Sequence, residues 1–438
     1  MLDSKALTKI RSMVLIAVII IAALGGVVIY IFWTRDTQPM HTIKIGVCAD
    51  IDNLMGKSIY QEAVLAVEQI NAEGGILGRL FEVVAEDDDS ESGNMDAAFA
   101  TNAFTKLITV DKADYVIAMG SFTTLYQELM FQHKTILFDA YNADDQSTQN
   151  VLDDYDKYKY YFRVGISNHT TISEGVTEDV VTIGEYTGFN KVAIVSYDMG
   201  LAGSDWLSDI VATLSDAKMD VVYTGIIPLT AVDFSSYFAQ AEAAGTEIMH
   251  CPNILPQSGV PFVKEYHDRQ SPMVVMGSIT AAARNDFWEI TEGKCEYVSY
   301  FAYSTGVGYP FTNKTLAFAE AYRDRWGEIG TGAVYDVVRY ILPDAIKRAV
   351  TFETDAVIAA LETVDVETSL ARHFIFTSSH DIMSGKRGYD EHPEDYFFVG
   401  MFQWQNGVQV PVLPKEIMEE AGATYLVPDW PGPWDNIS

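Results

Sequence analysis

Short apolar runs alternate with segments of helical pattern along most of the chain. Residues 43–49 are an apolar, β-branched-rich run typical of a buried strand, and residues 58–71 place apolar side chains at the three- and four-residue steps of a buried helix face. Gly74 and Gly75 then provide a helix stop, and a second apolar run follows at 80–85. The pattern predicts a β-α-β unit over residues 43–89, and we expect its final acidic run, 86–90, to cap the next helix on the outer surface.

The same alternation continues beyond this unit. Further apolar runs, with helical patterns between them, lie at 114–119, 135–138, 191–196, 219–227, 247–250 and 273–276. Strands that alternate with helices form parallel sheets, and about ten such strands divide more naturally into two sheets than into one very wide sheet. We therefore expect an α/β protein with two doubly wound parallel-sheet lobes.

Two aromatic runs, 158–164 and 297–303, are candidate crossing points between these lobes. With crossings there, lobe 1 comprises residues 42–163 and about 304–376, and lobe 2 comprises residues 164–303 and about 377–438. Residues 332–350 in the returning segment have a helical pattern, and we expect Pro343 to kink or break that helix.

The N-terminus has the pattern of a membrane anchor. Residues 13–33 are an unbroken apolar run, long enough at about 1.5 Å per residue to cross a ~30 Å hydrocarbon core. Basic residues precede the run, so the positive-inside rule places residues 1–12 in the cytoplasm and the rest of the chain outside the cell. Because the run ends in aromatic residues rather than a small-residue cleavage site, we expect an uncleaved single-pass anchor in the cell membrane. The linker 34–41 then keeps the folded part close to the membrane.

Composition narrows the possible partners. Asp and Glu number 61 against 29 Lys and Arg, which gives a formal net charge of -32 and argues against nucleic acid as a partner. The three cysteines have no metal-ligand spacing, so we expect no metal site; Cys48 reads as a core residue, and a disulfide between Cys251 and Cys295 stays open.

No catalytic pattern is visible in the sequence. His373, His380 and His392 lie near acidic residues, but their spacing does not place two zinc ligands on one helix face. The chain has no Gly-x-Ser-x-Gly elbow and no glycine-rich phosphate loop followed by lysine. We expect a protein that is not an enzyme and needs no cofactor.

Several stretches together resemble a known family. They are IKIGVCAD (43–50), AVLAVEQINAEGGILGRLFEVVAEDD (63–88), DYVIAMGSFTT (114–124), NKVAIVSYD (190–198) and VGMFQWQNG (399–407). In these residues the chain resembles the periplasmic-type solute-binding proteins that deliver branched-chain amino acids and related solutes to ABC importers. The resemblance implies a type I periplasmic-binding-protein fold, in which two lobes joined by a three-segment hinge close on a small-molecule ligand, and an ABC transporter permease as partner.

The expected ligand-binding residues of lobe 1 follow its strands, because ligands of open parallel sheets lie beyond the carboxyl ends of the strands. The resemblance implies that Ser121, in the loop 120–124 with Thr123 and Thr124, holds a ligand carboxylate. The alternative is that these hydroxyls only cap the next helix. In the loop 139–144 the family's Thr position is Ala143, and neighbouring polar groups can replace the missing contact. The remaining candidates in lobe 1 are Tyr141, Asn142, Asp52 and Asn53.

Lobe 2 departs from the family pattern. Loops 197–203 and 250–254 should face the ligand, which makes Tyr197, Leu201 and Asn253 candidates, together with Thr280 after the strand 273–276. The resemblance implies an acidic residue after that strand, for the amino group of an amino acid, but residues 277–280 contain none. Either another acid, such as Asp139, Asp198 or Asp52, replaces it, or the ligand has no free amino group.

The functional expectation is therefore a membrane-anchored, extracytoplasmic solute-binding protein. It captures an amino acid, an amide or a short carboxylic acid and delivers it to an ABC importer. The alternative is a ligand-sensing ectodomain of a receptor. Only about a dozen residues precede the apolar run, too few for a cytoplasmic output domain, so such a receptor would act through a partner subunit.

Overall fold

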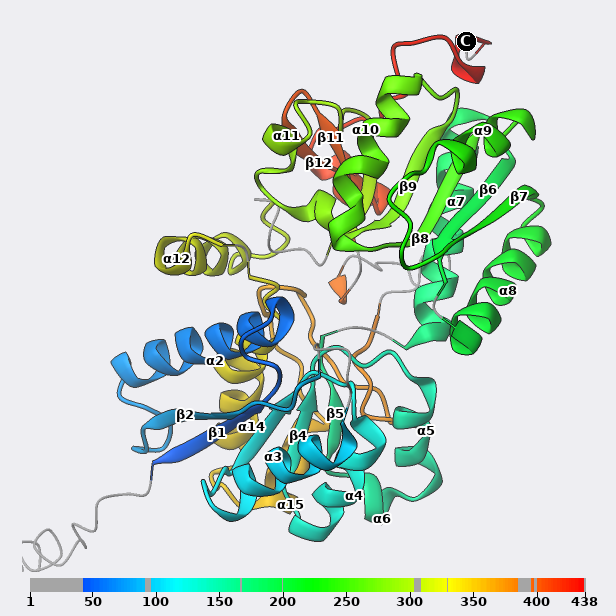
Figure 1. Ribbon diagram of the computed structural model, residues 1–438. Coiled ribbons are helices and arrows are strands. Elements are labelled where there is room, and N and C mark those ends of the chain that lie inside the picture. Colours follow the sequence, from blue (N-terminus) through cyan, green and yellow to red (C-terminus); the bar gives the residue numbers. More distant parts are fainter. Residues whose placement is uncertain are drawn as a thin grey trace, which may run out of the picture. The chain divides into compact units, whose positions relative to one another are not determined.

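The computed structural model describes residues 42–90, 96–165, 168–198, 200–302, 309–328, 330–384, 395–397 and 400–436. Residues Met1–Thr42 and Ile43–Ser438 form separate units, and the described helices and strands belong to the second unit. The strands of this unit form two sheets, each covered by helices (Figure 1).

The first sheet has five parallel strands in the order β2-β1-β3-β4-β5. In chain order these are β1 (Ile43–Cys48), β2 (Phe81–Glu86), β3 (Tyr115–Ala118), β4 (Ile136–Asp139) and β5 (Tyr161–Arg163). The chain moves outward from β1 to β2 and then returns to β3 on the other side of β1. In open parallel sheets, ligands bind beyond the carboxyl ends of the strands at such a reversal.

The helices of the first sheet follow the predicted alternation. They are α2 (Leu54–Ala72), α3 (Ala97–Thr109), α4 (Thr123–His133), α5 (Asp145–Asp153), α6 (Tyr155–Tyr158), α12 (Thr315–Trp326), α13 (Ala333–Asp336), α14 (Leu342–Ala349) and α15 (Thr354–Leu361). α3 and α4 lie on the face of the sheet opposite to α2 and α14 (Figure 1). The predicted glycine stop is confirmed, because Gly74 and Gly75 follow α2 with φ values of 95° and 79°.

The second sheet has seven strands in the order β12-β11-β10-β9-β8-β6-β7. They are β6 (Lys191–Tyr197), β7 (Asp220–Ile227), β8 (Ile248–Ile254), β9 (Val274–Ile279), β10 (Ser299–Ala302), β11 (Gly400–Gln405) and β12 (Val408–Leu413). The first five pair in parallel, with a reversal of strand order between β6 and β8. Its helices are α7 (His169–Thr187), α8 (Gly200–Asp216), α9 (Ser235–Ala243), η1 (Pro256–Ser258), α10 (Gly259–Arg269), η2 (Thr280–Ala283), α11 (Phe287–Ile290), α16 (Lys415–Glu420) and η6 (Pro433–Asn436).

One edge of the second sheet corrects the expectation of purely parallel sheets. β11 pairs antiparallel with both β10 and β12. The turn between β11 and β12 consists of Asn406 and Gly407, with φ values of 51° and 80°. A two-residue turn with positive φ at both positions matches the twist of a hairpin, and the Asn-Gly pair favours it.

Two hydrophobic cores accompany the two sheets. The first core takes buried residues from 43–164 and 318–397, and the second from 180–311 and 401–434. The chain therefore passes from one core to the other three times. The exact lobe boundaries given above stay a prediction; Ile382 and Phe397, which we assigned to lobe 2, belong to the first core.

The helical segment around Pro343 does not break at that residue. Helical structure runs over 333–349, and a π-helical stretch, Val337–Ile341, comes immediately before α14. Proline has no N–H to donate to the carbonyl four residues earlier, and its ring crowds that carbonyl. A π-helical turn has a wider hydrogen-bond spacing, so the chain passes the proline without leaving the helix.

The acidic run after β2 is another correction. α3 is capped by Asp96, whose carboxylate accepts the backbone N–H groups of Ala98 and Phe99. Asp88 of the acidic run is instead buried, and its carboxylate accepts the hydroxyl of Tyr126 at 2.8 Å. Because α3 begins at Ala97, the acidic run 86–90 is too far upstream to cap it.

The predicted anchor, 13–33, and the linker, 34–41, lie outside the described residues. Among the helices that are described, none is both long enough and apolar enough to span a bilayer. Cys48, Cys251 and Cys295 are all buried and unbridged, so the open question of a Cys251–Cys295 disulfide is answered against it.

Candidate functional site

The loop after β3 brings open backbone groups to the carboxyl edge of the first sheet. α4 begins at Thr123, and its N-cap residue, Phe122, offers no side chain to the first turn. The first N–H groups of a helix have no partner within the helix, so this end is suited to an anionic group. Ser121 is half-buried and Thr124 is exposed. If the hydroxyls of this loop only capped the helix, we would expect a side-chain hydrogen bond at its N-cap, and the N-cap residue of α4 makes none.

Gly120 lets this loop lie directly on the next one. Its φ is 91°, and a Cβ atom at this position would lie 2.6 Å from the backbone nitrogen of Asn142 and 2.8 Å from Oδ1 of Asp139. Both separations are too short for a side chain. Glycine is therefore required for the loops after β3 and β4 to meet.

Thr123 and Asp139 connect the two loops. The Thr123 hydroxyl donates to Oδ2 of Asp139 at 2.5 Å and lies 2.9 Å from the carbonyl oxygen of Gly120. Asp139 is fully buried. Burial raises the pKa of Asp139 to about 6, and the side-chain hydrogen bonds of Thr123, Tyr161 and Asn142 and the charge of the Arg163 guanidinium oppose that shift. The sequence marked Asp139 only as one of three replacement acids.

The polar side chains of the loop after β4 are held inside the first lobe. The Asn142 amide donates to the hydroxyls of Ser147 and Tyr161, at 2.7 and 3.2 Å. The Tyr141 hydroxyl lies 2.5 Å from that of Thr331. Ala143, also in this loop, is half-buried. Asn142 and Tyr141 therefore organise the loop, and their contact with a ligand stays a prediction.

The loop after β1 is a separate cluster at the same edge. Asn53 donates through its side-chain amide to Asp50 at 2.6 Å, and Asp50 is buried. Asp52 and Asn53 are exposed. The pair fixes the entry to α2 and leaves Asp52 on the surface, where water screens its charge.

The candidates on the second sheet differ in burial. Tyr197 is fully buried, with its hydroxyl 2.5 Å from that of Ser258 and 3.3 Å from the carbonyl oxygen of Ala231. Asn253 is half-buried near the end of β8, and Thr280 is exposed at the start of η2. The side chain of Leu201 lies outside the described part of the chain.

His250 begins the segment 250–254, which we expected to be a loop facing the ligand; the segment instead lies within the strand β8. His250 is fully buried, and neither ring nitrogen has a hydrogen-bond partner among the described residues. Burial lowers its pKa to about 3, so the ring is neutral at pH 7. No local sequence signal distinguishes a buried histidine of this kind from an apolar strand residue.

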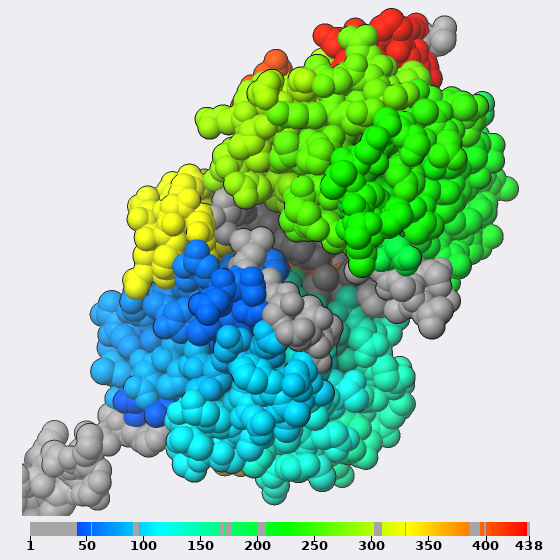
Figure 2. Space-filling view, in the orientation of Figure 1, coloured from blue at the N-terminus to red at the C-terminus, as the bar shows by residue number. Residues whose placement is uncertain are grey.

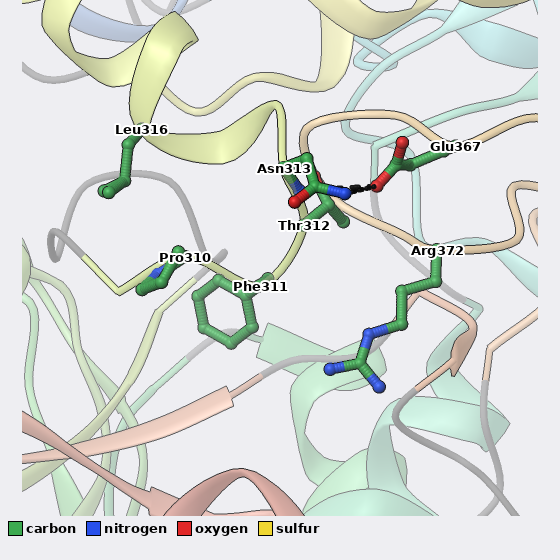
Figure 3. Close-up of a pocket in the computed structure, with 7 residues that line it drawn as sticks. All are labelled: Pro310, Phe311, Thr312, Asn313, Leu316, Glu367 and Arg372. Carbon is green, nitrogen blue, oxygen red and sulfur yellow. Dashed lines mark hydrogen bonds between the residues drawn. The ribbon is translucent and has the colours of Figure 1, made fainter. Parts of the chain in front are cut away.

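One pocket in the described part of the chain is lined by residues of none of these loops. Its volume is about 660 Å³, and its lining comes from the segment before α12, from one residue of α12 and from two residues after α15: Pro310, Phe311, Thr312, Asn313, Leu316, Glu367 and Arg372 (Figure 3). α12 itself is at the surface in the space-filling view, in yellow (Figure 2). Arg372 is already paired with Asp395 and Glu420, at 3.3 and 3.0 Å, and Asn313 bonds to Glu367. The charge of Arg372 is therefore paired within the chain, whereas the Glu367 carboxylate accepts hydrogen bonds from Asn313 alone among the described residues.

Two largely parallel sheets, with open loops at the carboxyl edge where the strand order reverses, define an α/β ligand-binding protein. The family model described as periplasmic binding protein matches residues 42–386, and the chain belongs to this family.

Individual relatives agree with this assignment. The Leu/Ile/Val-binding protein homolog 7 of Brucella abortus is 23% identical over 379 residues, which cover 82% of this chain and 88% of that protein. The branched-chain amino acid transporter substrate-binding protein LivJ of Streptococcus pneumoniae, solved with isoleucine, has a TM-score of 0.64 at 20% identity and covers 85% of this chain and 100% of its own. An ABC transporter solute-binding protein of R. palustris, solved with benzoate, has a TM-score of 0.64 at 16% identity, covering 85% and 96%. These relatives are solute-binding proteins. The expectation that this chain is not an enzyme is therefore confirmed.

Proposed function

We propose that the chain is an extracytoplasmic solute-binding protein that captures a small polar solute and delivers it to an ABC importer. The solute is an amino acid, an amide or a short carboxylic acid, and residues 13–33 hold the protein at the cell membrane as a single-pass anchor. Membership of the periplasmic binding protein family and the isoleucine and benzoate complexes of relatives support this proposal.

One observation carries the proposal. The uncapped N-terminus of α4 lies at the carboxyl end of β3, next to the reversal of strand order, and Gly120 lets a second loop meet it there. This combination offers backbone donors to an anionic group of a ligand, as expected where α/β sheets bind small molecules. Ser121 adds a hydroxyl at the same place.

Capture by two lobes also gives the transporter a signal to read. Ligand contacts made by both lobes stabilise a closed form over an open form, and only the closed form docks productively on a permease. The short linker raises the effective concentration of the binding protein at its membrane partner. No nucleotide or other cofactor is part of this mechanism.

A thermal-shift screen of the full chain in detergent tests solute capture. The panel contains amino acids, their amides, short carboxylic acids and dipeptides. A ligand present at a hundredfold excess over its Kd stabilises the native protein by about 2.7 kcal/mol, which gives a measurable increase in Tm. The absence of any shift across the panel would contradict solute capture.

The anchor has its own test. Mass spectrometry of the protein extracted from membranes should recover a peptide from within residues 1–12. A mature N-terminus located after Trp33 would show that the segment is removed, and the membrane part of the proposal would be wrong.

A further inference from the structure

Three Asn-X-Ser/Thr triplets occur in the sequence, at residues 168–170, 313–315 and 436–438. This triplet is the acceptor motif for N-linked glycosylation of exported proteins. The attached oligosaccharide is bulky and polar, so a modified asparagine has to lie on the surface of the folded protein. The side chain of Asn436 lies outside the described part of the chain. The structure can therefore distinguish between Asn168 and Asn313.

Asn313 has the exposure that the modification requires. It lies in a turn immediately before α12 and is exposed. Its side-chain amide and its backbone N–H both donate to Oε1 of Glu367, each at the long distance of 3.3 Å. An N-linked asparagine keeps one N–H on its amide nitrogen, so the contact with Glu367 is not lost when a sugar is attached. An oligosaccharide at this position is therefore compatible with the fold.

Open space lies beside the Asn313 side chain. Asn313 lines the pocket of about 660 Å³ described above, which has the size of a small-ligand pocket (Figure 3). Leu316, on the same pocket, is an exposed apolar residue. Glu367 and Arg372 contribute polar groups that can bond to sugar hydroxyls. The first sugar on Asn313 thus has both room and partners.

Asn168 lies in a different environment. It is half-buried, and its side-chain amide donates to Oδ2 of Asp381 at 2.8 Å. Asp381 is buried and accepts from the same oxygen a hydrogen bond of the buried Arg163 at 3.3 Å. The hydroxyl of Thr170, the third residue of this triplet, donates to Asp145 at 2.6 Å. An oligosaccharide on Asn168 would have to displace this cluster.

We propose that Asn313 is a site of N-linked glycosylation and that Asn168 is not. This inference rests on the proposed extracytoplasmic location of the folded part. The co-reactant is an oligosaccharide linked to a lipid phosphate. The amide nitrogen of Asn313 forms a bond to the anomeric carbon of the oligosaccharide, the bond from that carbon to the phosphate oxygen breaks, and the lipid phosphate leaves. The amide proton that is lost goes to a base of the transferase.

The third residue of the Asn313 triplet determines when the transfer takes place. Thr315 is fully buried, and its hydroxyl accepts the backbone N–H of Thr312 at 3.0 Å and donates to the carbonyl oxygen of Ser369 at 2.8 Å. The motif requires a hydroxyl at this position. Since folding buries that hydroxyl, the oligosaccharide is attached during export, before the segment 312–315 docks on the residues after α15.

Mass spectrometry of the protein purified from its native membranes tests the assignment. After proteolysis, the peptide with Asn313 should carry the added mass of an oligosaccharide and release sugar fragments, and the peptide with Asn168 should have the mass of its sequence. Asn190 is an internal control, because it is exposed and followed by lysine, as Asn313 is, but the triplet has valine at its third position; it should be unmodified. Asn313→Gln, made in the same organism, should lose the oligosaccharide, and Asn168→Gln should retain it at Asn313.

A labelling experiment separates failure of this inference from failure of the proposed location. A membrane-impermeant amine reagent is added to protoplasts, and Lys415, which is exposed, reports whether the folded part is outside. If Lys415 is labelled but Asn313 is unmodified, or if Asn168 carries an oligosaccharide, this inference is wrong while the proposed location stands. If Lys415 is labelled only after lysis, the proposed location fails and this inference with it.

Discussion

The carboxylate of Glu62 in α2 accepts the backbone N–H of Gly332 at 3.0 Å, although the two residues are 270 positions apart in the sequence. It also accepts the backbone N–H groups of Thr331, Val334 and Tyr335, at 2.7, 3.0 and 3.1 Å. Glu62 is fully buried, and burial raises the pKa of its carboxyl group even though these hydrogen bonds oppose the shift. One side chain of the first β-α-β unit therefore caps the helical segment that begins with α13.

Removal of this carboxylate should destabilise the protein. Glu62→Ala leaves several backbone donors buried without an acceptor, so we expect the free energy of unfolding to fall by about 3 kcal/mol. Glu68→Ala is the control on the same helix, because Glu68 is exposed and pairs with Arg325; it should change stability by less than about 1 kcal/mol. Guanidinium chloride unfolding measures both, and equal effects would show that the Glu62 cap is not important.

The local elements could be predicted from the sequence because their signals are periodic. The apolar run at 43–49 became Ile43–Cys48, and the helical pattern at 58–71 became Leu54–Ala72. The contact between Glu62 and Gly332 could not be predicted, since no local pattern marks a partner so distant in the chain. The hairpin at Asn406 and Gly407 did have a signal in its turn residues, which the expectation of parallel sheets overlooked.

The candidate site was predictable only in part. The sequence placed the loops 120–124 and 139–144 at strand ends, and the structure brings these two loops together through Thr123 and Asp139. The sequence could not show that the Asn142 amide donates a hydrogen bond to Ser147, because this contact depends on how the loop folds back on α5. At such an edge, burial decides whether a polar side chain bonds within the protein or stays open to a ligand. Burial depends on the tertiary structure, which local sequence patterns do not specify.

A side chain at position 120 should disrupt the meeting of the two loops. Gly120→Ala combines a φ of 91° with a Cβ atom 2.6 Å from the backbone nitrogen of Asn142, so we expect a loss of about 2–3 kcal/mol and of ligand binding. Gly188→Ala separates the two causes. Gly188 has a φ of 79° with open space around its Cβ position, so it should cost only about 1 kcal/mol. Thermal unfolding that gave the same loss for both variants would rule out the steric part of this argument.

The stability of the protein should depend on pH through Asp336. Burial raises the pKa of this residue from 3.8 to about 7, and the backbone N–H groups of Ser369 and Leu370 oppose the shift. The native state then binds the proton more tightly than the unfolded state. The stability that Asp336 contributes is fully present below about pH 4 and is lost as the pH rises through 7.

Asp336→Asn should remove this dependence. The difference in unfolding free energy between the wild type and Asp336→Asn should change by up to ~1.4 kcal/mol per pH unit between pH 4 and 7, in favour of the wild type at low pH. Urea unfolding at several pH values measures it. Asp344→Asn, at a half-buried position of the same helical segment that pairs with Arg348, is the control and should give a profile parallel to that of the wild type. If the stability of Asp336→Asn changed with pH in parallel with that of the wild type, the Asp336 carboxyl group would be ionised to the same extent in the native and unfolded states. That outcome would contradict the prediction.

His250 and His380, both buried, should respond in opposite ways to substitution by leucine. His250 has no hydrogen-bond partner for either ring nitrogen among the described residues, so His250→Leu removes two unpaired polar groups and should leave stability unchanged or raise it by about 1 kcal/mol. His380 lies 3.0 Å from the carbonyl oxygen of Tyr161 and 3.1 Å from Glu362, and its ring stacks on Phe162 at 4.1 Å. His380→Leu should therefore cost about 2 kcal/mol, because it leaves the buried carbonyl of Tyr161 without that donor. Chemical unfolding of both variants gives the comparison, and a strong loss of stability in His250→Leu would show that the ring has a bonding partner after all.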